Sequence, residues 1–346
     1  MTEGHGTREA ANRPEHVTFR PLAERPDYAG LAAAVSASLA ADGIRNSVSA
    51  EELDVFYQNL PDFDPASDSL LAWLGNQVGG EAYLIQMLED SGRRIYFHHT
   101  YLDPVCRLPG VLPTMMDYVE TRAGWLHGQR PAEDDAILRT VVSEGERDYL
   151  HEMEQRGYQP ERYFYQMVRP TLQDIPEPPR PHGIELRPVQ EDHFHAIWEA
   201  KEEAFEDHWG HRQTTEEDYQ RFLQDPIQDP ARWIVAWDGD QIAGMVLNFI
   251  DEDENRQWGR QRGYTEDISV RRPWRRRGLA TYMIAESLRR LRDLGMQEAA
   301  LGVDVDNPSG ALTLYERLGY QVDRRSTSYA RPASSRATAP TPPASI

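Results

Sequence analysis

An arginine-rich segment between a strand-like stretch and a long helical pattern is the first feature that suggests chemistry. EDISV (Glu266–Val270) runs into RRPWRRRGLA (Arg271–Ala280), where the helix begins. Free amide N–H groups at a helix start, together with the helix dipole, attract anions. Gly278 would let the backbone approach such an anion closely. Three arginines add positive charge there: Arg275, Arg276 and Arg277. The segment therefore predicts a phosphate-binding loop.

The loop is not of a common nucleotide-binding type. G-x-x-x-x-G-K-[ST] and G-x-G-x-x-G are both absent, which argues against a nucleoside triphosphate or NAD at this position. The alternative is a solvated basic helix start. Positive charge at a helix N-terminus is unfavourable unless an anion offsets it, so we favour the anion site.

A second motif lies downstream, after one further strand-like stretch. Arg275-x-x-Gly278-x-Ala280 resembles the acyl-CoA pyrophosphate loop of the GCN5-related N-acetyltransferases (GNAT). NPSGALTLYERLGY (Asn307–Tyr320) resembles that family's second signature, in which an asparagine starts a helix and a tyrosine lies late in it. The resemblance covers residues 183–330 well and residues 16–170 more loosely. It implies acetyl-CoA as co-substrate and no metal.

The resemblance also implies roles for individual residues. The positions that match the family's acetyl-CoA contacts are Ile268, Ser269, Val270, Arg275, Arg276, Arg277, Gly278, Leu279, Ala280 and Asn307. Tyr315 matches the late-helix tyrosine that protonates the departing thiolate as a general acid. The alternative for Tyr315 is a buried core residue at helical spacing with Leu312 and Leu318.

A general base is expected on the strand before the loop, where family members often use a glutamate acting through water. Glu266 would share a face with Ile268 and Val270 by strand alternation. Asp267 is the competing candidate and would face the other side. A solvated carboxylate without a catalytic role is the alternative for Glu266.

The family's acceptor site is walled by the end of the first helix of the domain and the loop after it. In EEAFEDHWGHR (Glu202–Arg212), the acidic residues Glu203, Glu206 and Asp207 could attract a cationic amine. The alternative is an ordinary acidic surface. His208 and His211 lack the spacing of a helical zinc site, so no metal is expected.

An internal repeat gives the domain organisation. VTFRPL and IELRPV open two stretches that end in EMEQRGYQ and LYERLGYQ. The expected segments are a disordered tail (1–15), a degenerate GNAT-like domain (16–170), a proline-rich linker (171–182), a catalytic GNAT domain (183–330) and a second disordered tail (331–346). The acidic run DEDEN (Asp251–Asn255) is expected to form a solvated hairpin tip.

The first half departs from the family pattern at both motifs. In its loop, Pro109 has no N–H group, and Leu112 replaces the small residue that packs near the ligand. In its second signature, Met153 stands in the place of Tyr315 and Gly145 in that of Asn307. Methionine cannot protonate a thiolate, so the first half is expected not to catalyse.

The composition sets the broad class of the chain. The 346 residues carry a net charge of −20 with 39% hydrophobic residues, which is globular and repels nucleic acid and anionic membranes. No apolar run suits a membrane span or a signal peptide, and Cys106 is the only cysteine. We expect a cytoplasmic monomer or homodimer with an α/β fold (an α+β mixed sheet) of two tandem GNAT-like acyl-CoA N-acyltransferase domains.

These observations favour an acetyl-CoA-dependent N-acetyltransferase that acts on a small-molecule amine through its second domain. The alternatives are a non-catalytic acyl-CoA-binding or sensing protein and an antibiotic-modifying acetyltransferase. The retained Tyr315 and Asn307 argue against pure binding, because binding alone requires no acid.

Overall fold

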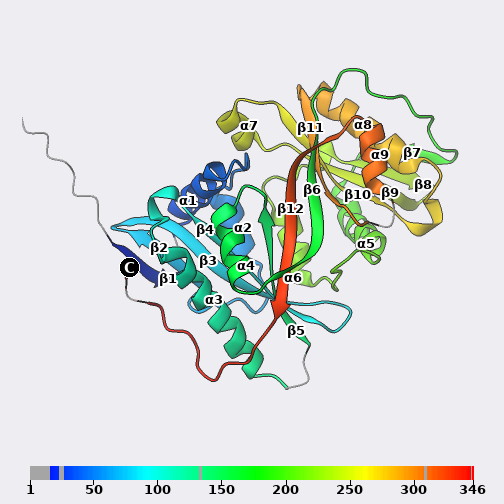
Figure 1. Ribbon diagram of the computed structural model, residues 1–346. Helices are drawn as coiled ribbons and strands as arrows, with labels where there is room; N and C mark the ends of the chain where they lie inside the picture. The colour runs from blue at the N-terminus through cyan, green and yellow to red at the C-terminus, as the bar shows by residue number, and fades with distance from the viewer. Residues whose placement is uncertain (1–15, 23–26, 132–134, 308–309, 344) are drawn as a thin grey trace, which may run out of the picture.

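Apart from the additional helix α7 (Glu252–Trp258) in the second half, the same order of helices and strands occurs twice along the chain. A computed structural model describes residues 16–22, 27–131, 135–307, 310–343 and 345–346 (Figure 1). The first half contains β1 (Val17–Pro21), α1 (Tyr28–Ala41), α2 (Ala50–Gln58), β2 (Ser69–Leu74), β3 (Gln77–Leu88), β4 (Arg94–Leu102), α3 (Val111–Gly128), β5 (Ala136–Ser143), α4 (Arg147–Gln155) and β6 (Gln159–Arg169). The second contains β7 (Ile184–Leu186), α5 (Phe194–Phe205), α6 (Glu216–Gln224), β8 (Ile234–Asp238), β9 (Gln241–Phe249), α7 (Glu252–Trp258), β10 (Arg262–Val270), α8 (Leu279–Asp293), β11 (Glu298–Asp304), α9 (Ala311–Arg317) and β12 (Gln321–Pro332).

The strands form one continuous sheet in which the two halves exchange their last strands. The order is β1-β2-β3-β4-β5-β12-β6-β11-β10-β9-β8-β7. The last strand of the second half, β12, lies against β5 of the first half, and β6 lies against β11 of the second. The long antiparallel pair β6–β12 joins the two parts in the middle of the molecule (Figure 1). Neither half can therefore complete its sheet with its own strands alone.

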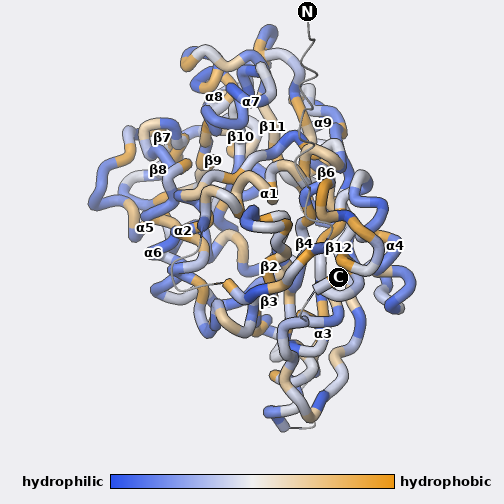
Figure 2. The backbone as a smooth tube through the Cα atoms, turned by 90° about the vertical axis from the view of Figure 1, so that its left-hand side faces the viewer, coloured by the Kyte–Doolittle hydropathy of each residue, from blue (hydrophilic) through white to orange (hydrophobic). Residues whose placement is uncertain are grey.

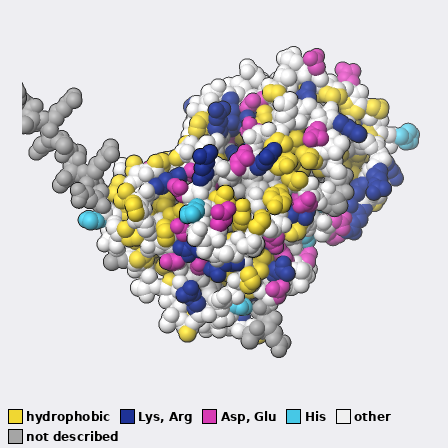
Figure 3. All heavy atoms as spheres, in the orientation of Figure 1, with side chains coloured by type: hydrophobic (Ala, Val, Ile, Leu, Met, Phe, Trp, Pro, Cys, Tyr) yellow, Lys and Arg dark blue, Asp and Glu magenta, His cyan; other side chains and the backbone are white. Residues whose placement is uncertain are grey.

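Helices cover both faces of the sheet in each half. In the first half, α1 and α2 cover one apolar cluster, and α3 and α4 cover the opposite one. In the second half, α5 and α6 lie on one face, and α8 and α9 on the other. The tube in Figure 2 shows apolar segments along the strands and hydrophilic segments at the periphery. Acidic and basic side chains intermingle on the face seen in Figure 3. Among the helices that the structure describes, none has the length and apolar character needed to cross a bilayer.

Two segments differ from the sequence-based expectation. DEDEN is not a hairpin tip but the start of α7, since Asp251 accepts a hydrogen bond from the N–H of Glu254 and Gly259 ends the helix with a positive φ of 60°. Residues 331 and 332 belong to β12, and beyond them the chain lies along α3, where the N–H of Arg336 donates to the carbonyl oxygen of Gly124. Gly124 makes this approach possible, because a Cβ atom there would lie 2.7 Å from the carbonyl oxygen of Ser334.

The end of the chain extends the sheet at its first strand. Ile346 exchanges two backbone hydrogen bonds with Val17, of 2.8 and 2.9 Å. Ala333 and Ile346 pack against the apolar cluster beneath α3. This apolar contact explains the ordered path of a segment whose composition predicts disorder. The expected tail 1–15 lies outside the described residues.

Candidate active site

A bulge interrupts β10 at the residues that precede the arginine loop. Pairing with β9 shifts between Glu266, opposite Leu247, and Ser269, opposite Met245. Asp267 lies in the bulge with a φ of 47°, a conformation that side chains other than glycine rarely adopt. Glu266 and Ser269 therefore share one face of the sheet.

The bulge overturns the expected alternation along this strand. Ile268 and Val270 pack against the cluster under α8, whereas Leu247, opposite Glu266, belongs to the cluster under α5. Glu266 is thus not on the face of Ile268 and Val270. Strict alternation fails because the bulge inserts an extra residue into β10.

The strands β10 and β11 pair only at their beginning and then separate. Their parallel pairing spans Arg262–Tyr264 of β10. Beyond it, the Glu266 carboxylate accepts a hydrogen bond of 2.9 Å from the N–H of Gly302 across the opening. Burial, reinforced by the Asp267 charge, raises the pKa of Glu266 to about 8, although the bond from Gly302 acts in the opposite direction. Glu266 can therefore exchange a proton near neutral pH.

Tyr315 lies on α9, on the side of the sheet covered by α8. Its ring is buried, with 7% of the residue exposed. The ring centroids of Tyr315 and Tyr320 lie 6.1 Å apart in an edge-on arrangement. Burial, and secondarily the Glu266 carboxylate, raises the pKa of Tyr315. The side chain is therefore a core residue that stays protonated at neutral pH and can donate a proton.

The arginine loop presents a row of free amide groups. Gly278 begins α8 with a φ of 79°, and no atom lies within 4 Å of the place of a Cβ. From Arg276 to Ala280, no amide N–H donates to an acceptor in the part of the chain that the structure describes. The side chains of Arg276 and Arg277 are exposed. This arrangement fits a pyrophosphate group.

The side chain of Arg275 is occupied within the protein. It donates to the carbonyl oxygens of Val270 and Ala204, at 3.0 and 3.1 Å, and to Asp207 at 3.0 Å. Arg275 thus ties the loop to the end of α5. Positive charge toward a ligand remains on Arg276 and Arg277.

The three acidic residues expected at the acceptor site are paired with arginines of the same loop. Glu203 binds Arg271 at 2.8 Å, and Asp207 binds Arg272 at 2.7 Å. The carboxylate of Glu206 lies 3.4 Å from Arg272. Hydrogen bonds from Arg272 and Arg275 lower the pKa of Asp207 to about 2. These carboxylates hold α5 against the loop, and the structure gives no support to their recognising an amine.

Residues of the first half that no local pattern marks lie against the loop after α5. The loop after α5 docks onto the first half, where His211 Nδ1 lies 2.7 Å from Asp90. The Trp209 ring lies against the guanidinium of Arg139, 4.4 Å away, and near Phe164. Lys201 lies 3.5 Å from the Asp267 carboxylate at the bulge. Only the fold brings these residues together, so no local pattern could identify them.

The equivalent region of the first half lacks these features. The pairing of β3 with β4 runs from Gly80–Leu102 to Leu88–Arg94 without a shift, so β4 has no bulge. In its loop, the N–H of Leu108 donates to Cys106 and that of Val111 to Leu108. Pro109 has no N–H, as noted above. No group of three or more metal-ligating side chains occurs within the described ranges.

Comparison with known proteins agrees with this geometry. Residues 194–320 match the model of the acetyltransferase (GNAT) family. A mycothiol acetyltransferase of Geodermatophilus obscurus is 27% identical over 315 residues, covering 86% of this chain and 92% of the relative.

Two solved structures share the fold over most of the chain. A GCN5-related N-acetyltransferase from Sphaerobacter thermophilus is 25% identical with a TM-score of 0.63, covering 95% of this chain and all of that one. A tandem GNAT protein from the clavulanic acid biosynthesis pathway has a TM-score of 0.64 at 15% identity, over 92% and 99% of the two chains. The expected fold class is confirmed. Residues 194–320 match the acetyltransferase (GNAT) family, and the chain is an acyltransferase.

Proposed function

We propose that this protein transfers an acetyl group from acetyl-CoA to the amine of a small molecule by direct attack on the thioester. Residues 183–330 form the catalytic domain, residues 16–170 form a degenerate one, and residues 171–182 link them. Because β6 and β12 are exchanged between the halves, we define these domains by their sequence ranges. Both domains contribute strands to one sheet.

The contrast between the two loops carries the proposal. The second half offers the unpaired amides of Arg276–Ala280 and two exposed arginines, whereas in the first half the N–H groups of Leu108 and Val111 bond within the loop, Pro109 has none, and no arginine stands at the two equivalent positions. A pyrophosphate requires both hydrogen-bond donors and positive charge. Acetyl-CoA would therefore bind the loop before α8.

The chemistry follows from the residues around the opening between β10 and β11. Glu266, directly or through water, accepts a proton from the ammonium form of the acceptor. The free amine attacks the thioester carbonyl, forming the C–N bond, and backbone groups at Ile268–Val270 stabilise the developing oxyanion. The C–S bond then breaks as the nitrogen of the intermediate loses its second proton to solvent, and the Tyr315 phenol donates its proton to the thiolate and regains one from solvent.

The proposed acceptor of the acetyl group is given as a chemical class, the amines of small molecules. The similarity to mycothiol acetyltransferase makes amines related to mycothiol the first compounds to test. A pure acyl-CoA sensor and an antibiotic-modifying transferase are the competing functions. A panel of amines with acetyl-CoA, followed by thiol release, distinguishes them, because a sensor releases no thiol and a drug-modifying enzyme prefers aminoglycoside-like amines.

A matched pair of variants tests the assignment to the second half. Gly278 and Gly110 both begin a helix with a positive φ, 79° and 87°, so a glutamate strains the backbone similarly at either position. Gly278→Glu should abolish calorimetric binding of acetyl-CoA through steric block and charge repulsion. Gly110→Glu should leave one site per chain. Loss of binding in Gly110→Glu alone would contradict the proposal.

A further inference from the structure

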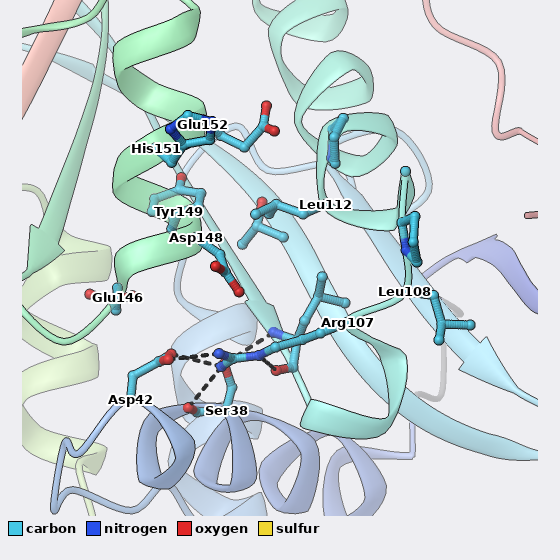
Figure 4. A pocket seen from close by; sticks show the side chains of 15 residues that line it. Ser38, Asp42, Arg107, Leu108, Leu112, Glu146, Asp148, Tyr149, His151 and Glu152 are labelled. Atoms are coloured by element: carbon cyan, nitrogen blue, oxygen red, sulfur yellow. Dashed lines mark hydrogen bonds and ion pairs between the residues drawn. The ribbon is translucent and has the colours of Figure 1, made fainter.

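The first half contains a cavity of about 330 Å³ between its loop, α1 and α4 (Figure 4). Its apolar wall comprises Leu102, Leu108, Pro109, Leu112 and Pro113. Through the repeat, this position corresponds to the loop and helix that border the candidate active site in the second half. The volume lies at the low end of the range for small-molecule sites.

The loop of this cavity has lost the positive charge of its counterpart. Aligning Gly110 with Gly278 pairs Leu108 with Arg276 and Pro109 with Arg277. Arg107 is retained, but both of its terminal nitrogens bind the Asp42 carboxylate at 2.7 Å (Figure 4). The loop thus offers a ligand little net positive charge.

The opposite wall has gained negative charge. Aligning Met153 with Tyr315 pairs Asp148 with Gly310 and Glu152 with Leu314, so two carboxylates line the cavity where the second half has uncharged residues. Glu152 contacts Arg156 at 3.3 Å, an arginine that it shares with Asp117 and Glu120, so the carboxylates around Arg156 outnumber it. Asp148 is exposed and points from α4 toward the cavity in Figure 4.

A third carboxylate lies deeper in the same wall. Glu146 is 7% exposed and also lines the cavity. Burial alone would raise the pKa of Glu146, but His99 at 3.0 Å and the N–H of Ser143 together lower it. The carboxylate is therefore ionised.

A buried hydroxyl group at the floor has no partner within the protein. Thr100 on β4 lines the cavity and is 5% exposed. Its Oγ1 makes no hydrogen bond within the described part of the chain. Buried hydroxyl groups are normally hydrogen-bonded, and rotation about χ1 would bring the Thr100 hydroxyl group, which has almost no accessible surface in this conformation, to a ligand in the cavity.

We propose that this cavity is a binding site for a small organic ammonium ion with a short apolar body. The carboxylates of Glu146, Asp148 and Glu152 attract the charge, and the leucines and prolines contact the body. An ammonium group has three N–H donors, enough to serve Thr100 Oγ1 and carboxylate oxygens together. The same charges repel a pyrophosphate. The site goes beyond the proposed acetyl transfer, because binding here requires no turnover.

Calorimetry with three ligands of equal chain length tests the charge preference. Hexylamine, hexanol and hexanoate are titrated into the full chain at low salt. Hexylamine should bind at least tenfold more tightly than the other two, and 0.5 M salt should weaken it, because screening reduces the attraction. Equal affinities, or no heat with hexylamine, would overturn the proposal.

Variants of the cavity wall locate the site. Asp148→Asn should weaken hexylamine binding about three- to tenfold, whereas Glu154→Gln, which removes an exposed charge elsewhere on α4, should not. Thr100→Val preserves shape and should also weaken it, with an unchanged melting temperature. Equal binding by Asp148→Asn and the wild type would place the amine elsewhere and refute the assignment.

One further titration tests whether coenzyme A, a polyanion, binds in the cavity. Coenzyme A is added to Gly278→Glu, whose second-half loop is blocked. No binding is expected. Binding that Gly110→Glu then removes would assign the cavity to coenzyme A and overturn the ammonium site, while the proposed acetyl transfer, tested separately by thiol release, would stand.

Discussion

Arg107 and Arg275 make the same three contacts in the two halves of the chain. Each guanidinium donates to the carbonyl oxygen at the end of the preceding strand, to a carbonyl near the end of the first helix and to an aspartate just after it. The acceptors are Leu102, Ser38 and Asp42 in the first half and Val270, Ala204 and Asp207 in the second. The repeat thus preserves a structural clamp even where the ligand-binding part of the loop has diverged.

Replacing the two clamp arginines should separate stability from acetyl-CoA binding. Arg107→Ala should lower the free energy of unfolding by about 1–2 kcal/mol, because it leaves the Asp42 carboxylate without its arginine, whereas Arg275→Ala should lower it less, because Arg272 still binds Asp207. Only Arg275→Ala should raise KM for acetyl-CoA, since its loop begins the proposed pyrophosphate site. Denaturant unfolding and steady-state kinetics check both effects. An equal rise in KM for both variants would contradict this division.

The pH dependence of activity should report on Glu266. With a pKa of about 8, the carboxylate is ionised only as the pH rises, so kcat/KM should increase up to about pH 8 and then level off. Glu266→Gln should lower kcat/KM by about 10²–10⁴-fold. It should also remove the rise of kcat/KM with pH, which is the acid limb of the profile. Asp267→Asn is the control and should keep the limb. A limb that persists in Glu266→Gln would assign the base elsewhere.

The raised pKa of Glu266 should also change the stability of the protein. Stability should fall as the pH rises, whereas activity should increase. The folded-state pKa of Glu266, about 8, exceeds the ordinary value of 4.5, so the folded protein binds this proton more tightly. The contribution to stability is complete below about pH 4.5 and is lost as the pH rises through 8. Glu266→Gln should therefore gain melting temperature relative to the wild type at pH 9 and not at pH 4.5. Parallel pH–melting curves would contradict the shift.

Local patterns predict most of the second half. The strand and helix expected around Gly278 match β10 and α8, because hydrophobic periodicity and a glycine at the helix start are local signals. The missed helix α7 also had local signals, namely Asp251 three residues before Glu254 and a terminal Gly259. Its high charge density led us to expect a solvated turn instead.

Features that depend on partners far apart in the sequence could not be predicted. Nothing within β6 specifies that it pairs with both β11 and β12, because strand partners depend on the whole sheet. The bulge at Asp267 arises from pairing with β9, and alternation alone placed Glu266 on the wrong face. Likewise, only the fold shows that Glu203 at the end of α5 and Asp207 just after it pair with Arg271 and Arg272, whereas their recognition of an amine stays a prediction.

The exchanged strands predict how the chain tolerates truncation. A fragment that begins at Pro181 lacks β5 and β6, so β12 loses both of its neighbours and β11 is left with an unpaired edge. It should aggregate. A fragment that begins at Gly157 retains β6 and should be more soluble. Size-exclusion chromatography and thiol release compare the two. A soluble, fully active fragment from Pro181 would show that the exchange is dispensable.

The role of Tyr315 is testable because its packing and its proton can be separated. Tyr315→Phe keeps the ring beside Tyr320 and removes only the hydroxyl group, so the melting temperature should change little. Acetyl-CoA affinity should persist, since the free amides lie in the loop before α8. If the phenol protonates the thiolate, kcat should fall about 10²–10⁴-fold while KM for acetyl-CoA stays near its original value. Tyr320→Phe removes a neighbouring buried hydroxyl that contacts Thr265 at 2.8 Å and serves as the matched control, expected to affect stability more than kcat. A normal kcat in Tyr315→Phe would mean that solvent protonates the thiolate and that Tyr315 is a packing residue of the core.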